Sequence, residues 1–258
     1  MTVTLAVVLF LAGALGGALN SVVGGATFVI FPALIFAGVP AVHANATSSV
    51  VVWPAALASA FAYRKDITLP RTLLASLAAA SLAGGAIGAW LLVHTPGAAF
   101  VQLVPWLLLF ASLLFSFGGV LSARLGVSAS GPGRGGAALL TVAAAQFAIS
   151  IYGGYFGAGM GILMLAVYAV ANLGTIHAMN GVRSLLGLLI NGVAIATFIF
   201  ARAIAWRPAV VMVLGATLAG YFGAALARRI DPATVRRLVL AVAWGMTVYF
   251  FLKTYHAI

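Results

Sequence analysis

The fold is decided by a glycine-rich run in the second half of the chain, residues 152–161, which read Tyr152-Gly153-Gly154-Tyr155-Phe156-Gly157-Ala158-Gly159-Met160-Gly161. This run lies inside residues 135–182, which contain no Lys, Arg, Asp or Glu. An apolar segment, residues 137–151, precedes the run, and a half-length apolar piece, residues 162–170, follows it. Because glycine disfavours a helix interior by about 1 kcal/mol relative to alanine, the cluster predicts a helix broken within an uncharged stretch.

Composition decides what surrounds this broken helix. The 258-residue chain is 64% hydrophobic and only 6% charged, and its mean hydropathy is +1.21. A soluble globular protein needs more polar surface than this composition supplies, so lipid must be the main solvent. The apolar runs are continuous over about 20 residues and lack the alternation of barrel strands. The sequence therefore predicts an all-α, polytopic membrane protein.

The first half of the chain follows the same plan as the second. Residues 1–63 also lack charged side chains, and glycine breaks at residues 16–17 and 24–25 precede a half-length apolar piece. In each half a loop with a histidine, His43 or His177, then leads into a helix with a polar start. Paired broken helices at matching positions are typical of secondary transporters, and they predict two pseudo-symmetric repeats spaced by roughly 125 residues.

The predicted organisation is a first transmembrane repeat over residues 1–123, a linker over 124–136 and a second repeat over 137–258. If each broken helix crosses the membrane once, the repeats are parallel, and if it forms a hairpin or two crossings, they are inverted. The inverted arrangement places nine Lys and Arg residues in cytoplasmic loops and three outside, against eight and four for the parallel one. The positive-inside rule therefore favours inverted repeats, chiefly through the loop from Arg228 to Arg237.

The net charge of +11 comes from 13 Lys and Arg against two acids, Asp66 and Asp231. The basic residues lie almost entirely between apolar runs, and no basic helix or aromatic-interleaved patch accompanies them, so nucleic acid is not an expected partner. Both acids lie among loop arginines and are interpreted as loop ion pairs. Cysteine is absent, which excludes disulfides and thiolate metal sites, and no metal or other cofactor is predicted. The first apolar run lacks a clear cleavage site and is expected to stay in the mature protein.

Polar side chains gather on one face of the helix that follows each loop histidine. The helical period places Asn180, Ser184 and Asn191 in one stripe with His177, and Arg183 borders it. In the first half, Asn45 corresponds to Asn180, Ser49 to Ser184 and Ser48 to Arg183. Amides and hydroxyls also join membrane helices, at about 1 kcal/mol per hydrogen bond, and this structural role stays open for each of them.

Arg183 is the basic residue that lies between charge-free runs, and no carboxylate in these runs can neutralise it. Snorkelling to the interface is its alternative role, since it lies about one and a half turns from the loop at His177. The glycine breaks expose unpaired N–H groups at a helix start, which favours an anion, or they serve close helix packing, the role assigned to Gly84-Gly85 and Gly88. A small anion is thus the predicted counter-ion of Arg183.

The residues predicted to bind this anion combine the arginine, the polar helix starts, the glycine breaks and the two histidines. They are Arg183, Asn45, Asn180, Ser48, Ser49, Ser184, Gly24, Gly25, Gly157, Gly159, His43 and His177. The histidines have two further interpretations, an interfacial helix cap and a proton relay. No catalytic residue and no metal ligand is predicted.

Several of these motifs together resemble the sulfite exporter TauE/SafE family of bacterial inner-membrane permeases. The resemblance covers nearly the whole chain, and its main segments are Leu19–Gly25, Phe31–Leu34, Ala44–Ser49, Tyr152–Gly161 and His177–Arg183. It implies transport, usually export, of sulfite or of organosulfonates such as sulfoacetate, across the inner (cytoplasmic) membrane. The first-half motif departs from the glycine-rich pattern, reading Gly25-Ala26-Thr27, which predicts less exposed backbone in that half.

The predicted function is a secondary transporter of a small sulfur-containing anion, with the lipid bilayer as its other partner. An anion channel and an importer of a different small anion remain alternatives. An intramembrane enzyme is disfavoured, because the sequence has no G-x-S-x-G elbow, no H-E-x-x-H pair and no carboxylate to orient the serines near His43 and His177. The sequence leaves the oligomeric state open, with a homodimer as one option.

Overall fold

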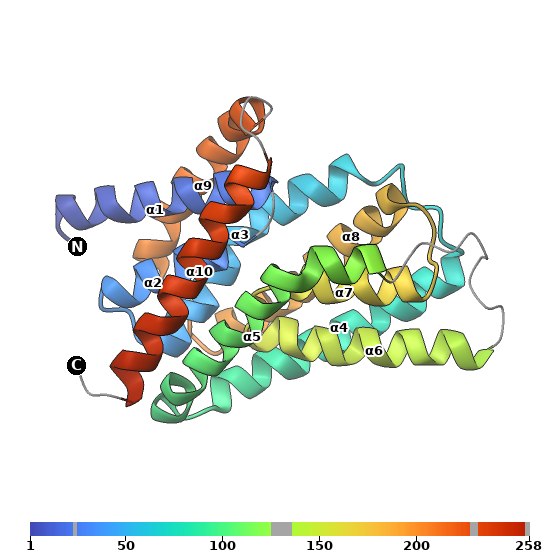
Figure 1. Cartoon of the computed structure of the whole chain (residues 1–258). Helices are drawn as coiled ribbons and strands as arrows, with labels where there is room; N and C mark the ends of the chain where they lie inside the picture. Colours follow the sequence, from blue (N-terminus) through green and yellow to red (C-terminus); the bar gives the residue numbers. More distant parts are fainter. Residues whose placement is uncertain (23–24, 125–135, 228–231, 256–258) are drawn as a thin grey trace. The chain divides into compact units, whose positions relative to one another are not determined.

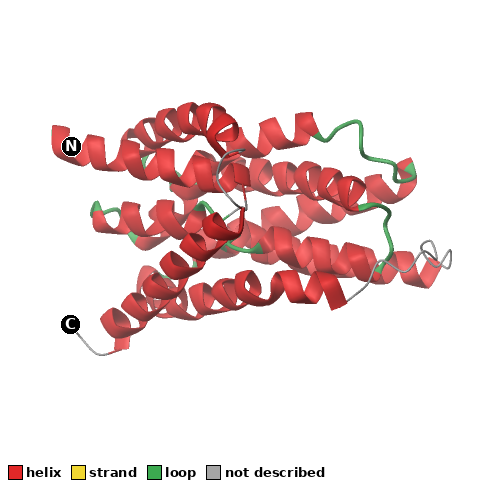
Figure 2. Ribbon diagram, turned by 45° about the horizontal axis from the view of Figure 1, so that its top comes forward, coloured by secondary structure: helices red, strands yellow, loops and turns green. Residues whose placement is uncertain are grey.

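The computed structural model describes the chain except for residues 23–24, 125–135, 228–231 and 256–258. The described residues form helices and short connections, without a β-strand, as Figures 1 and 2 show. The helices are α1 (Val3–Val22), α2 (Thr27–Phe36), α3 (Ala41–Ala62), α4 (Arg71–His94), α5 (Gly97–Arg124), α6 (Gly136–Tyr155), α7 (Met160–Val170), α8 (Ile176–Phe200), α9 (Trp206–Ala227) and α10 (Pro232–Tyr255).

Five of these helices contain a described stretch that is long and apolar enough to cross a membrane. These stretches are Val3–Asn20, Arg71–His94, Gly97–Phe117, Ile176–Phe200 and Arg236–Tyr255. Three shorter apolar helical stretches accompany them, Thr27–Phe36, Met160–Val170 and Trp206–Ala219. The prediction of an all-α, multi-pass membrane protein is confirmed.

The order of the helices is the same in the two halves of the chain. A half-length helix, α2 or α7, stands second in each set of five, after a full-length one. Each helix of the second set begins 133 to 135 residues after its counterpart, a longer spacing than the predicted one of roughly 125 residues. The paired starts are Val3 and Gly136, Thr27 and Met160, Ala41 and Ile176, Arg71 and Trp206, and Gly97 and Pro232. Repeat symmetry in space and its inverted orientation stay predictions.

The chain folds into two compact units, and each draws helices from both halves of the sequence. Unit 1 comprises Met1–Ala55, Leu92–Ser112 and Phe198–Ile258, and unit 2 comprises Ala56–Leu91 and Leu113–Thr197. Unit 1 therefore contains α1, α2, α9 and α10, whereas unit 2 contains α6, α7 and most of α4 and α8. The division into repeats at residues 1–123, 124–136 and 137–258 is a different grouping, and it stays a prediction about the sequence.

In unit 1, glycines allow α1 to pack closely along α9. A Cβ atom on Gly13 would overlap backbone atoms of Met212, and one on Gly17 would overlap those of Ala216. From the other side, a Cβ on Gly215 would overlap the backbone of Phe10. Small residues allow such close approach of helix backbones in membranes, where dispersion contacts replace the hydrophobic effect as the driving force.

In unit 2, glycines likewise allow α4 and α6 to pack closely. A Cβ on Gly84 or Gly88 would overlap backbone atoms of Phe147 or Ile151, and a Cβ on Gly154 would overlap the backbone of Gly85. The assignment of Gly84, Gly85 and Gly88 to packing is therefore confirmed. In both units the first helix of one half thus packs against the fourth helix of the other half.

Candidate functional site

The predicted break in the second half lies between α6 and α7 in unit 2. Gly157 and Gly159 have φ angles of 78° and 76°, left-handed conformations that side chains with a Cβ rarely adopt. The hydroxyl of Tyr152 donates a 2.6 Å hydrogen bond to the carbonyl oxygen of Ala158, between the two glycines. This bond holds the turn in place, and α7 begins directly after it at Met160.

The first-half break has a sparser turn. Between α1 and α2, Gly25 has a φ of 92°, and Ala26 then leads directly into the helix in a right-handed conformation. The backbone N–H of Phe28 already donates to the carbonyl oxygen of Gly25, at 3.1 Å. The other glycine predicted here as a site residue, Gly24, lies outside the described residues.

Arg183, on α8, lies against the first turn of α7. A Cβ on Gly161 would come within 3.0 Å of the Nη1 atom and 3.3 Å of the Cδ atom of Arg183. The absence of a side chain at Gly161 therefore makes room for the guanidinium beside the start of α7. The Nε atom of Arg183 is buried and has no hydrogen-bond partner. Among the described residues, Arg183 forms no ion pair with a carboxylate.

Two tyrosines, Tyr63 and Tyr168, interact electrostatically with Arg183. Tyr63 follows α3, and Gly181 lets α8 approach it, because a Cβ there would lie 3.1 Å from the carbonyl oxygen of Tyr63. Tyr168 lies on α7 and is fully buried. The guanidinium is thus surrounded by residues of α7, α8 and the end of α3.

A buried polar network fixes Tyr168. Its hydroxyl donates a 2.8 Å hydrogen bond to Oε1 of Gln146, and Nε2 of Gln146 donates to the hydroxyls of Ser81 (2.9 Å) and Ser150 (3.2 Å). All four side chains are fully buried. Because the hydroxyl hydrogen of Tyr168 is used toward Gln146, this hydroxyl cannot also donate to an anion.

Asn180 and Ser184 are the other residues of α8, besides Arg183 and His177, that were predicted to bind the anion. Nδ2 of Asn180 donates to the carbonyl oxygen of Ile176 at 2.9 Å, a bond within its own helix. Ser184, next to Arg183, has a buried hydroxyl without a hydrogen-bond partner. Ser184 therefore has an unused hydroxyl donor, and Asn180 uses one of its two amide N–H donors within its own helix.

Both histidines lie in the first turn of a helix, and not in the preceding loop as the sequence suggests. The carbonyl oxygen of Pro40 accepts a hydrogen bond from the N–H of Ala44, so α3 is already formed at His43. The hydroxyl of Thr175 accepts one from the N–H of Ala178 and caps α8 ahead of His177. His177 is exposed, whereas Nδ1 of His43 is buried without a hydrogen-bond partner.

The predicted site residues of the first half belong to unit 1. Asn45 and Ser48 are buried, and the hydroxyls of Ser48 and Ser49 donate to the carbonyl oxygens of Ala44 (2.8 Å) and Asn45 (3.4 Å) on their own helix. These two bonds fit the structural alternative for hydroxyls in membrane helices. A ligand role for Asn45, Ser48 and Ser49 stays a prediction.

The sequence did not predict Tyr63 and Tyr168 as neighbours of Arg183, or Gln146 as the hydrogen-bond partner of Tyr168. One signal was present, because Gln146 and Tyr168 are polar residues inside apolar runs of the charge-free stretch 135–182. Among the described residues, no group of three or more His, Asp or Glu side chains lies close enough to hold a metal ion.

Comparison with known proteins agrees with the helical membrane architecture. The family described as sulfite exporter TauE/SafE matches residues 9–250. A probable membrane transporter protein, ORF9, from Sinorhizobium sp is 26% identical over 243 residues, which cover 93% of this chain and 90% of that protein. A probable membrane transporter protein from Haemophilus influenzae is 26% identical over 247 residues, 95% of this chain and 94% of that protein. No solved structure matches. The chain therefore belongs to the sulfite exporter TauE/SafE family and is a multi-pass membrane transporter.

Proposed function

We propose that this transporter is a secondary carrier that exports a small sulfur oxyanion, sulfite or a short organosulfonate, across the inner (cytoplasmic) membrane. The observation that carries the proposal is the position of Arg183. Its guanidinium lies against the first turn of α7, and its buried Nε has no hydrogen-bond partner. The anion binds at this place in unit 2.

Two positive groups meet at the site without a carboxylate. The N-terminus of a helix carries a partial charge of about +0.5, and arginine stays protonated in proteins. In a low-dielectric environment these charges repel each other, and a bound anion interacts favourably with both. The left-handed glycines Gly157 and Gly159 turn the start of α7 toward Arg183, so the local backbone supports the same charge preference.

The geometry of the donors favours an oxyanion over a spherical halide. A guanidinium presents a planar fork of N–H groups that matches two oxygen atoms of one anion. Sulfite and sulfonate groups each offer three oxygens around one sulfur atom. The hydroxyls of Ser184 and Tyr63 are further candidate donors, because Ser184 has an unused hydroxyl and Tyr63 interacts with Arg183. The family match makes sulfur the preferred central atom.

The balance of charge supports export. An inside-negative potential favours the exit of an anion by about 2.3 kcal/mol per charge per 100 mV. Efflux therefore needs no coupled ion, whereas concentrative uptake would need a co-transported cation. The only two carboxylate side chains in the sequence, Asp66 and Asp231, lie among loop arginines and offer no proton carrier within an apolar run.

The test is anion flux from proteoliposomes of the full chain, loaded with sulfite or sulfoacetate, with the membrane potential set by a potassium gradient and valinomycin. We expect saturable flux that accelerates when the loaded side is negative. Arg183→Ala should abolish this flux, and Arg183→Lys should retain part of it because it keeps the charge but loses the planar fork. Arg71→Ala, which removes an exposed cation from the same unit, is the matched control.

Each alternative has its own outcome in this experiment. Flux that does not saturate would replace the carrier by a channel. Flux that ignores the membrane potential would contradict electrogenic export. If Arg183→Ala and Arg71→Ala both transport like the wild type, the anion does not bind at Arg183.

A further inference from the structure

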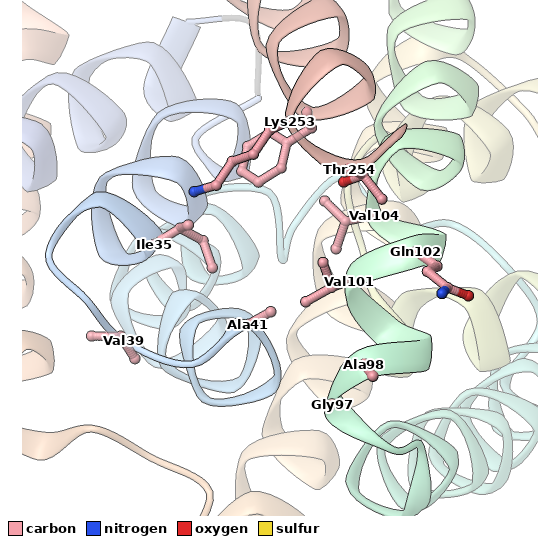
Figure 3. A pocket seen from close by; sticks show the side chains of 11 residues that line it. Ile35, Val39, Ala41, Gly97, Ala98, Val101, Gln102, Val104, Lys253 and Thr254 are labelled. Atoms are coloured by element: carbon pink, nitrogen blue, oxygen red, sulfur yellow. The ribbon is translucent and has the colours of Figure 1, made fainter. Parts of the chain in front are cut away.

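Unit 1 contains a pocket of about 490 Å³ that is separate from the residues around Arg183. It lies between α2, the start of α5 and the end of α10, and Figure 3 shows the side chains that line it. Its volume falls within the range of about 300–1,000 Å³ that is typical of small-molecule sites. None of the residues that line this pocket takes part in the proposed anion site.

The pocket lies at the end of two candidate membrane spans. Its lining includes Gly97, the first residue of the span Gly97–Phe117, and Lys253, near the end of the span Arg236–Tyr255. Around it α2 ends and α3 begins, so several helices terminate at this level. Such a position corresponds to the membrane–water interface.

Aromatic residues next to the pocket support this placement. Nε1 of Trp106 donates to the hydroxyl of Tyr255 at 3.0 Å, and that hydroxyl donates to the carbonyl oxygen of Gln102 at 3.1 Å. The ring of Phe251 packs edge-on against Trp106. Trp and Tyr residues with one polar and one apolar side concentrate at membrane interfaces.

The chemistry of the pocket is that of an amphiphile site. Its floor is apolar and buried, with Val104 1% and Phe250 5% exposed, and it opens past Val101, which is 42% exposed. At its rim lies the ammonium group of Lys253, 5.8 Å from the ring centre of Tyr249. Among the described residues that line it, none is Asp or Glu. The apolar floor can accommodate a hydrocarbon chain, and the ammonium group of Lys253 at the rim attracts a negatively charged group.

We propose that this pocket binds an anionic phospholipid, with part of an acyl chain against Val101, Val104 and Phe250 and the phosphate beside Lys253. The pocket opens on an apolar face at the level where lipid headgroups lie, so a bilayer lipid reaches it without leaving the membrane.

The experiment is native mass spectrometry of the purified full-length protein, titrated with phosphatidylglycerol or phosphatidylethanolamine of identical acyl chains. We expect the wild type to retain one phosphatidylglycerol about fivefold more strongly, which corresponds to the roughly 1 kcal/mol that one lysine contributes toward anionic lipid. Lys253→Ala should make the retention of the two lipids equal. Lys65→Ala, which removes a lysine from unit 2, should leave the preference unchanged.

A second variant tests the apolar part of the pocket. A Cβ on Gly97 meets no atom within 4 Å, so Gly97→Leu fills space without a clash and should lower the retention of both lipids. Size-exclusion profiles identify any variant that fails to fold. Equal retention of the two lipids by the wild type, unchanged lipid preference in Lys253→Ala, or unchanged retention in Gly97→Leu would overturn the proposal. Displacement of the lipid by free sulfite or sulfoacetate would also overturn it and assign the pocket to the transported anion.

Discussion

Arg183 and Gly161 lie on different helices, and the Nη1 atom of Arg183 lies 3.0 Å from the position that a Cβ on Gly161 would occupy. The side chain that is missing at Gly161 thus defines where the guanidinium can lie. Position 161 is the second residue of α7, so the same contact brings the cation to the start of the half-length helix. A substitution at Gly161 therefore changes the position of the guanidinium while it leaves the positive charge of Arg183 in place.

We expect Gly161→Ala to displace the guanidinium of Arg183 and to raise the KM for anion flux about tenfold, the effect of losing one charge-assisted hydrogen bond. Proteoliposome flux measures the effect. Gly187→Ala on α8 is the control, because the nearest atom to its Cβ, in Met160, lies 3.8 Å away, an ordinary contact. Equal KM values for the two variants would show that the position of the guanidinium does not matter for binding.

The network around Gln146 should govern the stability of unit 2. Gln146→Leu leaves the buried hydroxyls of Tyr168 and Ser81 without their amide partner. The expected loss is about 1–3 kcal/mol per unsatisfied group, seen as a lower thermal midpoint in detergent. Gln102→Leu changes an exposed glutamine in unit 1 and should shift stability by no more than about 0.5 kcal/mol. A midpoint for Gln146→Leu that matches this control would contradict a structural role for the network.

The left-handed turn before α7 should tolerate few residues. Gly159→Ala places a Cβ at a φ of 76°, which costs about 1–2 kcal/mol. Gly159→Asn should cost less, since asparagine adopts this conformation more readily. Thermal unfolding of both variants ranks their stabilities. An alanine variant as stable as the asparagine variant would contradict the left-handed conformation at Gly159.

Helix packing in unit 1 should depend on Gly17. Because a Cβ there overlaps backbone atoms of Ala216 on α9, Gly17→Ala should destabilise by about 1–3 kcal/mol. Gly245→Ala on α10 is the matched control: its Cβ meets nothing within 4 Å, and alanine is the better helix former. Thermal unfolding should rank Gly245→Ala at or above the wild type. The reverse ranking would rule out close contact of α1 with α9.

The sequence predicted the membrane class, the half-length helices and the break at residues 157–159 because these features depend on local composition. Apolar length selects helices that can cross a bilayer, and glycines in a left-handed conformation separate α6 from α7 at Gly157 and Gly159. The predicted break at residues 16–17 is wrong, because α1 continues to Val22 and Gly17 serves close packing on α9 instead. The predicted repeat spacing of roughly 125 residues was too short, although the sequence carries the longer value, since His43 and His177 lie 134 residues apart. Helix starts such as those at Ala41 and Ile176 depend on capping by Pro40 and Thr175, a weaker signal than hydropathy.

The environment of Arg183 could be predicted only in part. The missing carboxylate is a property of composition, and it pointed correctly to an arginine without an ion-pair partner among the described residues. The contacts with Gly161, Tyr63 and Tyr168 depend on how α7, α8 and the end of α3 pack, which no spacing along one helix reveals. Likewise, helical periodicity put Asn180 on a polar face but could not show that its amide group bonds back to Ile176.

The packing of α1 on α9 and of α6 on α4 has a consequence for the order in which the protein is made. Unit 2 is complete in sequence once Thr197 is synthesised, so all of its residues leave the ribosome ahead of α9 and α10. Unit 1 needs Phe198–Ile258, and until then the glycine face of α1, with Gly13 and Gly17, has no α9 to cover it. Although α1 precedes every helix of unit 2 in the sequence, it therefore meets its packing partner α9 only after unit 2 has been synthesised in full.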